Sequence, residues 1–212
     1  MMAAMRRHRD ERGTAIVEFA LVAPILFLIL FGIIEFGFVF KDSLTLTNMT
    51  RSGVRTGAAV GNATSPDADF QILQAIAGAS GALSANINYV IIFKASSNSG
   101  TVPATCLTAA ATPTIPDGVD TASAQCNIYT STQISDVEGA GATWASQPTS
   151  RWGCSAGTWD SYYCPGSRIV SQSAGPDYLG VYISAHHSTI TGFFHALTLS
   201  DTSVMRLEPQ TP

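Results

Sequence analysis

The stretch TAIVEFALVAPILFLILFGIIEFGFVF, residues 14–40, decides the architecture of this chain. Its only ionisable side chains are those of Glu18 and Glu35. A helix rises 1.5 Å per residue, so roughly 20 residues cross a hydrocarbon core of about 30 Å. The sequence therefore predicts a transmembrane helix over residues 14–40.

Positive charge is concentrated before that stretch. Only Lys41 follows it directly, whereas four arginines precede it: Arg6, Arg7, Arg9 and Arg12. Because basic flanks stay on the cytoplasmic side of a membrane, residues 1–13 are predicted to form a basic cytoplasmic leader. The rest of the chain is then expected outside the cytoplasm, which predicts a single-pass cell membrane protein with a cytoplasmic N-terminus.

A secretory signal peptide also combines a basic start with an apolar stretch. Here the apolar stretch is longer than the core of a signal peptide, and LTLTNMTRSG, residues 44–53, offers no A-x-A-like cleavage site. The segment is therefore interpreted as an anchor. One alternative stays open, a signal-anchored extracytoplasmic enzyme or ligand-binding protein that uses the helix as a simple tether.

Glu18 lies just inside the near end of the predicted span. A charged side chain inside a membrane helix costs about 3 kcal/mol on insertion scales unless something compensates it. A cut between Gly13 and Thr14 would make Glu18 the fifth residue of the mature chain, one helical turn from a free α-amine. The amine and the helix N-terminus are both positive. Cleavage would therefore turn Glu18 into half of an ion pair, with the amine of its own chain or of a neighbouring one.

The stretch RGTAIVEFALVAPILFLILFGIIEFG, residues 12–37, resembles the N-terminus of the TadE-like family of tight-adherence (Flp) pilus assembly proteins, which are pseudopilins of the type IV pilin class. In that class a basic leader ends in glycine, and a glutamate and an aromatic residue follow. The resemblance implies that Gly13 and Thr14 form the processing site of a prepilin peptidase and that Glu18 and Phe19 act in assembly.

The same resemblance implies a function and a set of partners. The chain is expected to be a membrane-anchored subunit that a prepilin peptidase processes and that assembles or primes a tight-adherence pilus. Its partners would be the peptidase, other pilus subunits, the inner assembly platform and membrane lipid. Two positions depart from common pilin patterns, since many pilins have tyrosine where Phe19 stands and phenylalanine or methionine where Thr14 stands.

Two further residues of the span invite interpretation. Pro24 lacks an amide hydrogen, so it predicts a kink that would let the subunit leave the bilayer, or else an ordinary transmembrane proline. Glu35 either faces a neighbouring helix or extends to the outer membrane interface near Lys41, and the interface is the favoured interpretation.

Residues 41–61 are predicted to continue the helix as an amphipathic stalk. Apolar side chains recur at helical spacing in this segment, and Arg51 and Arg55 would share one face. Gly53, Gly57 and Gly61 lie four residues apart, which would permit close helix packing and would weaken the helix toward Gly61.

Residues 62–212 are predicted to form an extracytoplasmic α+β domain with a small antiparallel sheet and long loops. A break near Pro66 precedes a short helix at 69–78. Residues 87–94, 177–187, 203–208 and the CNIYTS stretch that starts at Cys126 have the β-branched and aromatic composition of strands. Residues 96–123 and 139–150 are expected to be loops because they are rich in small and polar residues.

The four cysteines, Cys106, Cys126, Cys154 and Cys164, all lie in the part expected outside the cytoplasm, where disulfides persist. Three pairings are possible, and the sequential one, Cys106 with Cys126 and Cys154 with Cys164, is preferred. The aromatic segment WGCSAGTWDSYYC, residues 152–164, would form either a small core around its bridge or an adhesive surface, and the core is preferred.

No enzyme motif, cofactor or metal site is predicted. His186, His187 and His195 invite a metal interpretation, but adjacent strand residues point to opposite faces, so at most one of His186 and His187 can share a face with another ligand. The sequence contains no Walker, H-E-x-x-H or G-x-S-x-G motif. The net charge of -4 and the absence of a basic stripe outside the leader argue against nucleic-acid binding.

Overall fold

The computed structural model describes residues 7–61, 67–138, 142–148, 150–171, 173, 175–189 and 196–209. The chain divides into two compact units. The first contains Met1–Lys41 with Thr189–His195, and the second contains Asp42–Ser188 with Ala196–Pro212. Pro66 and His195 lie outside the described residues.

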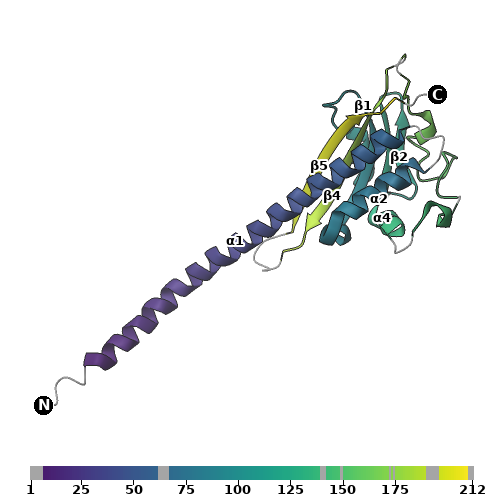
Figure 1. Cartoon of the computed structure of the whole chain (residues 1–212). Coiled ribbons are helices and arrows are strands. Elements are labelled where there is room, and N and C mark those ends of the chain that lie inside the picture. The colour runs from purple at the N-terminus through teal and green to yellow at the C-terminus, as the bar shows by residue number, and fades with distance from the viewer. Residues whose placement is uncertain are drawn as a thin grey trace. The chain divides into compact units, whose positions relative to one another are not determined.

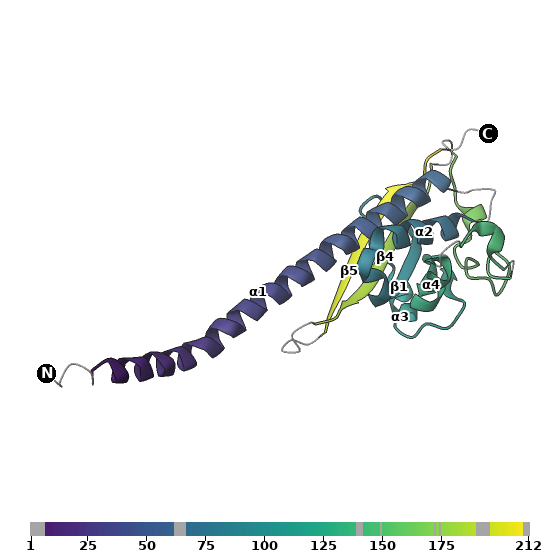
Figure 2. The same ribbon diagram turned by 60° about the horizontal axis from the view of Figure 1, so that its bottom comes forward.

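A single long helix, α1 (Arg7–Val60), contains both the predicted span and the predicted stalk (Figure 1). Its candidate membrane span, Gly13–Val60, has a stretch with a mean hydropathy of 2.7, and the helix is long and apolar enough to cross a membrane. The helix passes through Pro24 without interruption, and Figure 2 shows a bend in its purple N-terminal part. It ends before Gly61, whose φ of 48° is left-handed and favours glycine.

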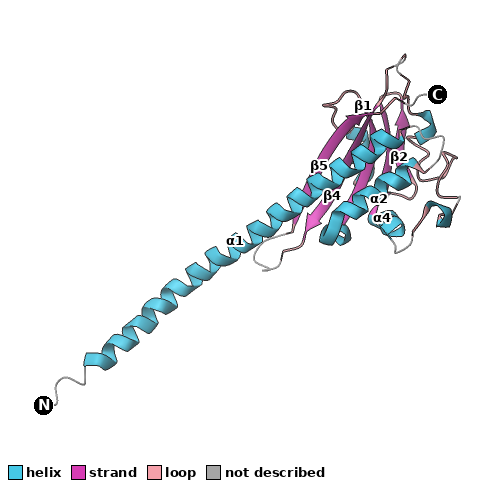
Figure 3. Ribbon diagram, viewed as in Figure 1, coloured by secondary structure: helices cyan, strands magenta, loops and turns pink. Residues whose placement is uncertain are grey.

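The second unit contains a five-stranded sheet in the order β2-β3-β1-β4-β5, and every neighbouring pair is antiparallel (Figure 3). The strands are β1 (Ile87–Ala95), β2 (Asp117–Thr121), β3 (Ala124–Thr130), β4 (Tyr178–His187) and β5 (Leu197–Arg206). Helix α2 (Ala68–Ser80) and the 3-10 helix η1 (Gly81–Asn86) precede β1. The predicted α+β class, with a long N-terminal helix and a small antiparallel sheet, is confirmed.

Five elements form where the sequence predicted loops or made no assignment. Helix α3 (Ala104–Ala110) and β2 lie within residues 96–123, so the loop prediction for that region was wrong. Composition missed them because β2 is stabilised by its ladder with β3, and Cys106 attaches α3 to β3. Helix α4 (Ser131–Glu138) follows β3 directly, and 3-10 helices form at η2 (Trp144–Ser146) and η3 (Pro165–Ser167).

Within the second unit, the C-terminal part of α1 packs closely on α2 and β4. A methyl group added at Gly53 would lie 2.7 Å from Ile76 Cγ1, and one added at Gly57 would lie 2.8 Å from Leu179 Cδ2. Both separations are shorter than van der Waals contact allows, so glycine lets the helix approach this closely. The expectation that these glycines permit close packing is confirmed.

The sheet has a core on each face. On the α1 and α2 face, Leu46, Met49, Ile72 and Ile76 pack against residues of β1 and β4 such as Ile92 and Val181. On the other face, α3 covers Ile91, Phe93 and Ile128. The ring of Phe93 lies where a Cβ of Gly180 would be, at 2.2 Å, so β4 needs glycine at that position. Alternation along β1 and β4 directs successive side chains into the two cores.

A buried ion pair links α2 to the segment that precedes β4. Asp69 accepts hydrogen bonds from the guanidinium of Arg168, from the Tyr129 hydroxyl at 2.7 Å and from Asn127 Nδ2 at 2.7 Å. The side chains of Asp69 and Arg168 have no exposed surface. Burial is the largest single influence and lowers the pKa of Arg168, but Asp69, Tyr163 and Tyr129 together raise it by more, so Arg168 stays charged. Burial, and then Asp69, raises the pKa of Tyr129 well above its ordinary value, so its hydroxyl keeps the proton that it donates.

Two disulfides fasten the segments between β1 and β4. Cys106 in α3 is bonded to Cys126 in β3, and Cys154 is bonded to Cys164. This is the sequential pairing that the sequence favoured. The first bridge is fully buried, whereas Cys154 and Cys164 are both partly exposed. The two bridges therefore differ in how readily a reductant reaches them.

Replacing Asp69 with asparagine should destabilise the second unit by about 3 kcal/mol, because it leaves the buried guanidinium of Arg168 without a counter-charge. The measurement is urea unfolding of the full chain in detergent, followed by tryptophan fluorescence. The matched control is Asp120→Asn, since Asp120 is exposed and bonded to Gln125 at 2.9 Å. That change should cost less than about 0.5 kcal/mol. Equal free energies of unfolding for the two variants would contradict the prediction that the buried Asp69–Arg168 pair matters more to stability than the exposed Asp120.

Partial reduction should open the two bridges in a fixed order. With increasing dithiothreitol, the partly exposed Cys154–Cys164 bond should be reduced first, and the buried Cys106–Cys126 bond should resist until the domain unfolds. Alkylation of the free thiols followed by mass spectrometry identifies which cysteines have been released. Release of Cys106 and Cys126 first, or of all four together, would show that burial does not control access.

Candidate functional site

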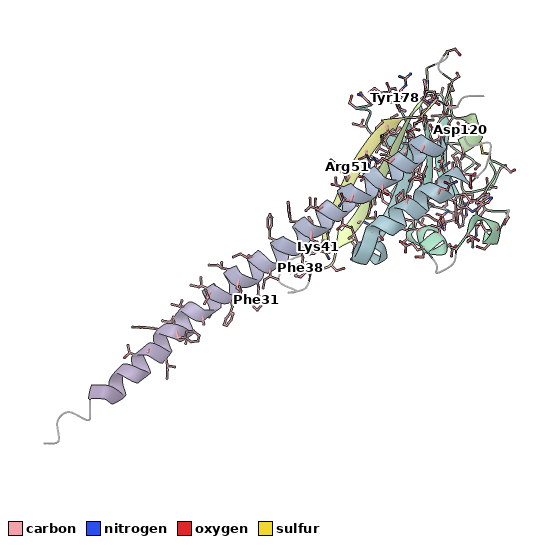
Figure 4. All side chains as sticks on the ribbon, viewed as in Figure 1. Phe31, Phe38, Lys41, Arg51, Asp120 and Tyr178 are labelled. Carbon is pink, nitrogen blue, oxygen red and sulfur yellow. A yellow bond between two sulfur atoms is a disulfide. The ribbon has the colours of Figure 1, made fainter. Side chains whose placement is uncertain are left out.

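The candidate site is the N-terminal part of α1, which we call the assembly segment, residues 13–24. Of its residues only Ala23 is buried, and Phe19 is 65% exposed. Every large apolar side chain from Ile16 to Ile34 is exposed, and Figure 4 shows sticks projecting on all sides of this part of the helix. A helix that is apolar all round needs lipid or other helices around it. The segment can therefore act as an anchor and as a helix-packing surface.

The residues predicted to be processed and to act in assembly lie on one continuous helix. Gly13 and Thr14 are inside α1, and a methyl group added at Gly13 would meet nothing within 4 Å. Thr14 and Glu18 are four residues apart in the helix, so they share a face. Glu18 is exposed. The helix thus brings position 14 and the Glu18 carboxylate to the same side, where an amine at position 14 could pair with Glu18.

Glu35 is buried in the structure, whereas the favoured interpretation has its side chain extending to the outer membrane interface. Its surface is only 4% exposed, although its neighbours Ile34 and Phe36 are exposed. A side chain that extends to an aqueous interface would show a larger exposed fraction. The structure therefore does not have Glu35 reaching outward from the helix.

The histidines are directed to opposite faces of the sheet, as expected. His187 Nδ1 lies 2.7 Å from Asp42 Oδ2 of α1, and His186 Nδ1 lies 3.1 Å from Asn88 Oδ1 of the neighbouring strand. No group of three or more possible metal ligands occurs among the residues that the structure describes. The contact between Asp42 and His187 was missed by sequence reasoning, because the two residues are 145 positions apart.

The aromatic segment at 152–164 forms a core. Trp152 and Trp159 are 4% and 8% exposed, and their ring centroids are 5.4 Å apart. Trp152 also contacts Phe70 of α2 and Tyr129 of β3. Tyr163 is buried, and Asp160 binds the loop backbone at Gly153 and Cys154. The preferred interpretation as a small core is confirmed for these rings, and the adhesive surface is not supported.

Sequence reasoning also missed the buried network around Asp69. Asp69 stands in the first turn of α2, where acidic residues are common, so its position carried no special signal. Arg168 lies in a segment without strong periodicity and is 99 residues away from Asp69. Only the folded chain brings the two charges together.

Comparison with known families agrees with the resemblance seen in the sequence. The family model described as TadE-like protein matches residues 13–55. The match begins at Gly13, includes the apolar part of α1 and continues into the part of the helix that packs on the sheet. Neither a curated protein nor a solved structure matches the chain.

The long apolar helix followed by a folded domain fits a single-pass membrane protein. The family match extends over the assembly segment and the first part of the stalk. On this evidence residues 13–55 of the chain are similar to the TadE-like proteins.

Proposed function

We propose that this protein is a pseudopilin-like subunit that is anchored in the cell membrane and acts in assembling or priming a tight-adherence pilus. The family match at residues 13–55 supports involvement in tight-adherence pilus assembly. The observation that carries the finer proposal is that this match begins at Gly13, directly before the apolar part of α1, in which Glu18 lies on the same face as position 14. The N-terminus would be cytoplasmic and the sheet domain extracytoplasmic.

The proposed first step is removal of residues 1–13 by a prepilin peptidase, which hydrolyses the peptide bond between Gly13 and Thr14. The new α-amine has a reference pKa of about 7.7 to 8.0, so much of it is protonated near neutral pH. Glu18 lies one helical turn away. An unpaired carboxylate in a membrane costs free energy, so an ion pair between the Glu18 carboxylate and that amine would be stabilising.

The pairing would become selective if the amine belonged to a neighbouring subunit. Two helices would then approach until one terminus meets the other's Glu18, which fixes their register along the helix axis. The exposed apolar side chains around Phe19 would pack between the helices. This mechanism is binding without catalysis, in line with the structural role of TadE-like pilus proteins. The partners would be the peptidase, other pilus subunits, the assembly platform and membrane lipid.

N-terminal sequencing of the full chain, extracted from membranes of cells that contain a prepilin peptidase, should give a chain that starts at Thr14. The Gly13→Leu variant should keep its leader, because the side chain occupies the position where the peptidase requires glycine. Gly37→Leu is the matched control, since a methyl group added there also meets nothing within 4 Å and Gly37 lies in the same helix. It should be cleaved normally. Functional chains that begin at Met1 would contradict the proposal.

Glu18→Ala should be cleaved like the unchanged protein but should co-purify with pilus subunits about tenfold less. Removing the carboxylate removes a charge-assisted hydrogen bond, which typically stabilises by about 1.5–3 kcal/mol. Glu18→Gln should behave like the alanine variant because it lacks the charge, and Glu18→Asp should retain part of the association. Normal piliation and normal co-purification in Glu18→Ala would remove Glu18 from the mechanism.

A further inference from the structure

Strand β5 forms one edge of the sheet in the second unit. It pairs with β4 along its whole length, from Tyr178 with Arg206 to His187 with Leu197. No second strand pairs with β5 among the residues that the structure describes. In an antiparallel ladder, alternate residues of an edge strand turn their N–H and C=O groups away from the neighbouring strand. The edge of β5 therefore presents a row of backbone donors and acceptors.

Helix α1 runs beside this edge in the direction of the strands. Gly57 approaches Leu179 and Gly53 approaches Val181, while Asp42 contacts His187 at the far end of β4. These contacts advance along β4 in the opposite chain direction to α1. Four helical residues rise about 6 Å, and two strand residues rise about 6.7 Å, so successive contact positions on the helix and on the strand have nearly the same spacing.

A groove of about 430 Å³ lies between α1 and the β5 edge. Ser203 and Met205 are paired with Val181 and Leu179, so their side chains point to the α1 side of the sheet. Met205 is 38% exposed. Arg51 projects from α1 (Figure 4), and Arg55 is also a residue of α1. The residues that line the groove are Arg51, Val54, Arg55, Ser203, Val204 and Met205.

The two arginines of the groove are suited to bind carboxylates. Arg51 and Arg55 are exposed, and neither forms an ion pair with another residue of the described ranges. They are four positions apart on one helix face, or about 6 Å along its axis. A strand added to β5 would place alternate side chains on the α1 side, about 6.7 Å apart. The spacing of the arginines therefore matches carboxylates at positions i and i+2 of an extended chain.

We propose that the β5 edge and the Arg51–Arg55 pair bind an extended segment of a partner polypeptide that has acidic side chains at alternate positions. The backbone of the segment would extend the sheet as a sixth strand, and its carboxylates would lie against the two guanidinium groups. Arginine binds carboxylates through two parallel hydrogen bonds, so each pair would add specificity as well as attraction. The proposal does not depend on processing at Gly13.

A second copy of this chain fits the site less well than a different partner. The other sheet edge, β2, carries Asp117 and Asp120, which are three positions apart and so point to opposite faces of the strand. The N–H of Gly118 already donates to Asp117 Oδ1 at 2.8 Å. The β2 edge therefore offers neither the acidic spacing nor a full row of free backbone groups.

The test is fluorescence anisotropy of labelled nine-residue peptides with the full chain in detergent micelles. The probe consists of threonine and valine with glutamates at its fourth and sixth positions. Its matched control has the same composition with the glutamates adjacent, so that they point to opposite faces. The probe should bind about fivefold more tightly than the control peptide, which keeps one of its two glutamates on the α1 side. The Arg51→Gln, Arg55→Gln double variant should abolish this difference. Thr105→Glu with Thr112→Glu, which changes the net charge equally at two exposed positions, should leave it intact.

Backbone pairing is tested with two methylated versions of the probe. One carries N-methyl groups on the odd residues and the other on the even residues, and only one set of N–H groups can face β5. Loss of binding with one version alone supports an added strand. Equal effects of both versions, or retention of the affinity difference between probe and control in the double glutamine variant, would overturn the proposal. So would concentration-dependent self-association of the chain that the glutamine variant abolishes, since the occupant would then be a second copy.

Discussion

The apolar surface of α1 between Ile16 and Ile34 sets the conditions for the rest of the structure. Fully burying one large apolar side chain stabilises by about 1.5–3 kcal/mol, and here all of them are exposed on every side of the helix. A helix that is apolar on every side is not stable when exposed to water, so lipid or neighbouring helices must cover it. The effects expected of Glu18 and Pro24 therefore depend on the lipid or helices that surround this part of α1.

The C-terminal part of the same helix meets a different constraint. From Leu46 onward its apolar side chains are confined to one stripe, which packs on α2 and β4, and glycines at 53 and 57 let the backbone approach. Its opposite face remains polar, with Arg51 and Arg55 exposed. One helix therefore combines a segment that exposes its apolar side chains with a segment that packs on the chain's own sheet.

Local patterns predicted the parts of the fold that local physics determines. The apolar run, the stalk periodicity and the β-branched stretches around Ile91 and Val181 each have a period or composition that suits one structure. Helix α3 and strand β2 could not be predicted in this way. Their residues, Ala104–Ala110 and Asp117–Thr121, have weak local preferences and are held by a disulfide and by a ladder with β3.

The same division applies to the sites. The predictions for Gly13, Glu18 and Phe19 could be made from the sequence because a basic stretch, an acidic residue and an apolar run stand next to one another. Contacts between distant residues were not: Asp42 meets His187, Asp69 meets Arg168, and Arg51 meets the end of β5 only after the chain folds. Nothing in the sequence around Met205 indicates that a basic groove lies beside it.

Charge plays a different physical part at each end of α1. Near Glu18 the surroundings are apolar, so a carboxylate without a partner is costly and an ion pair there has few competitors. Arg51 and Arg55 face solvent, where salt screens charges beyond about 8 Å and an exposed ion pair contributes at most about 1 kcal/mol. The two arginines can therefore contribute more to the specificity of binding than to its affinity. The strength of binding at that surface must come mainly from the backbone of β5, which is why the free strand edge and the two charges form one site.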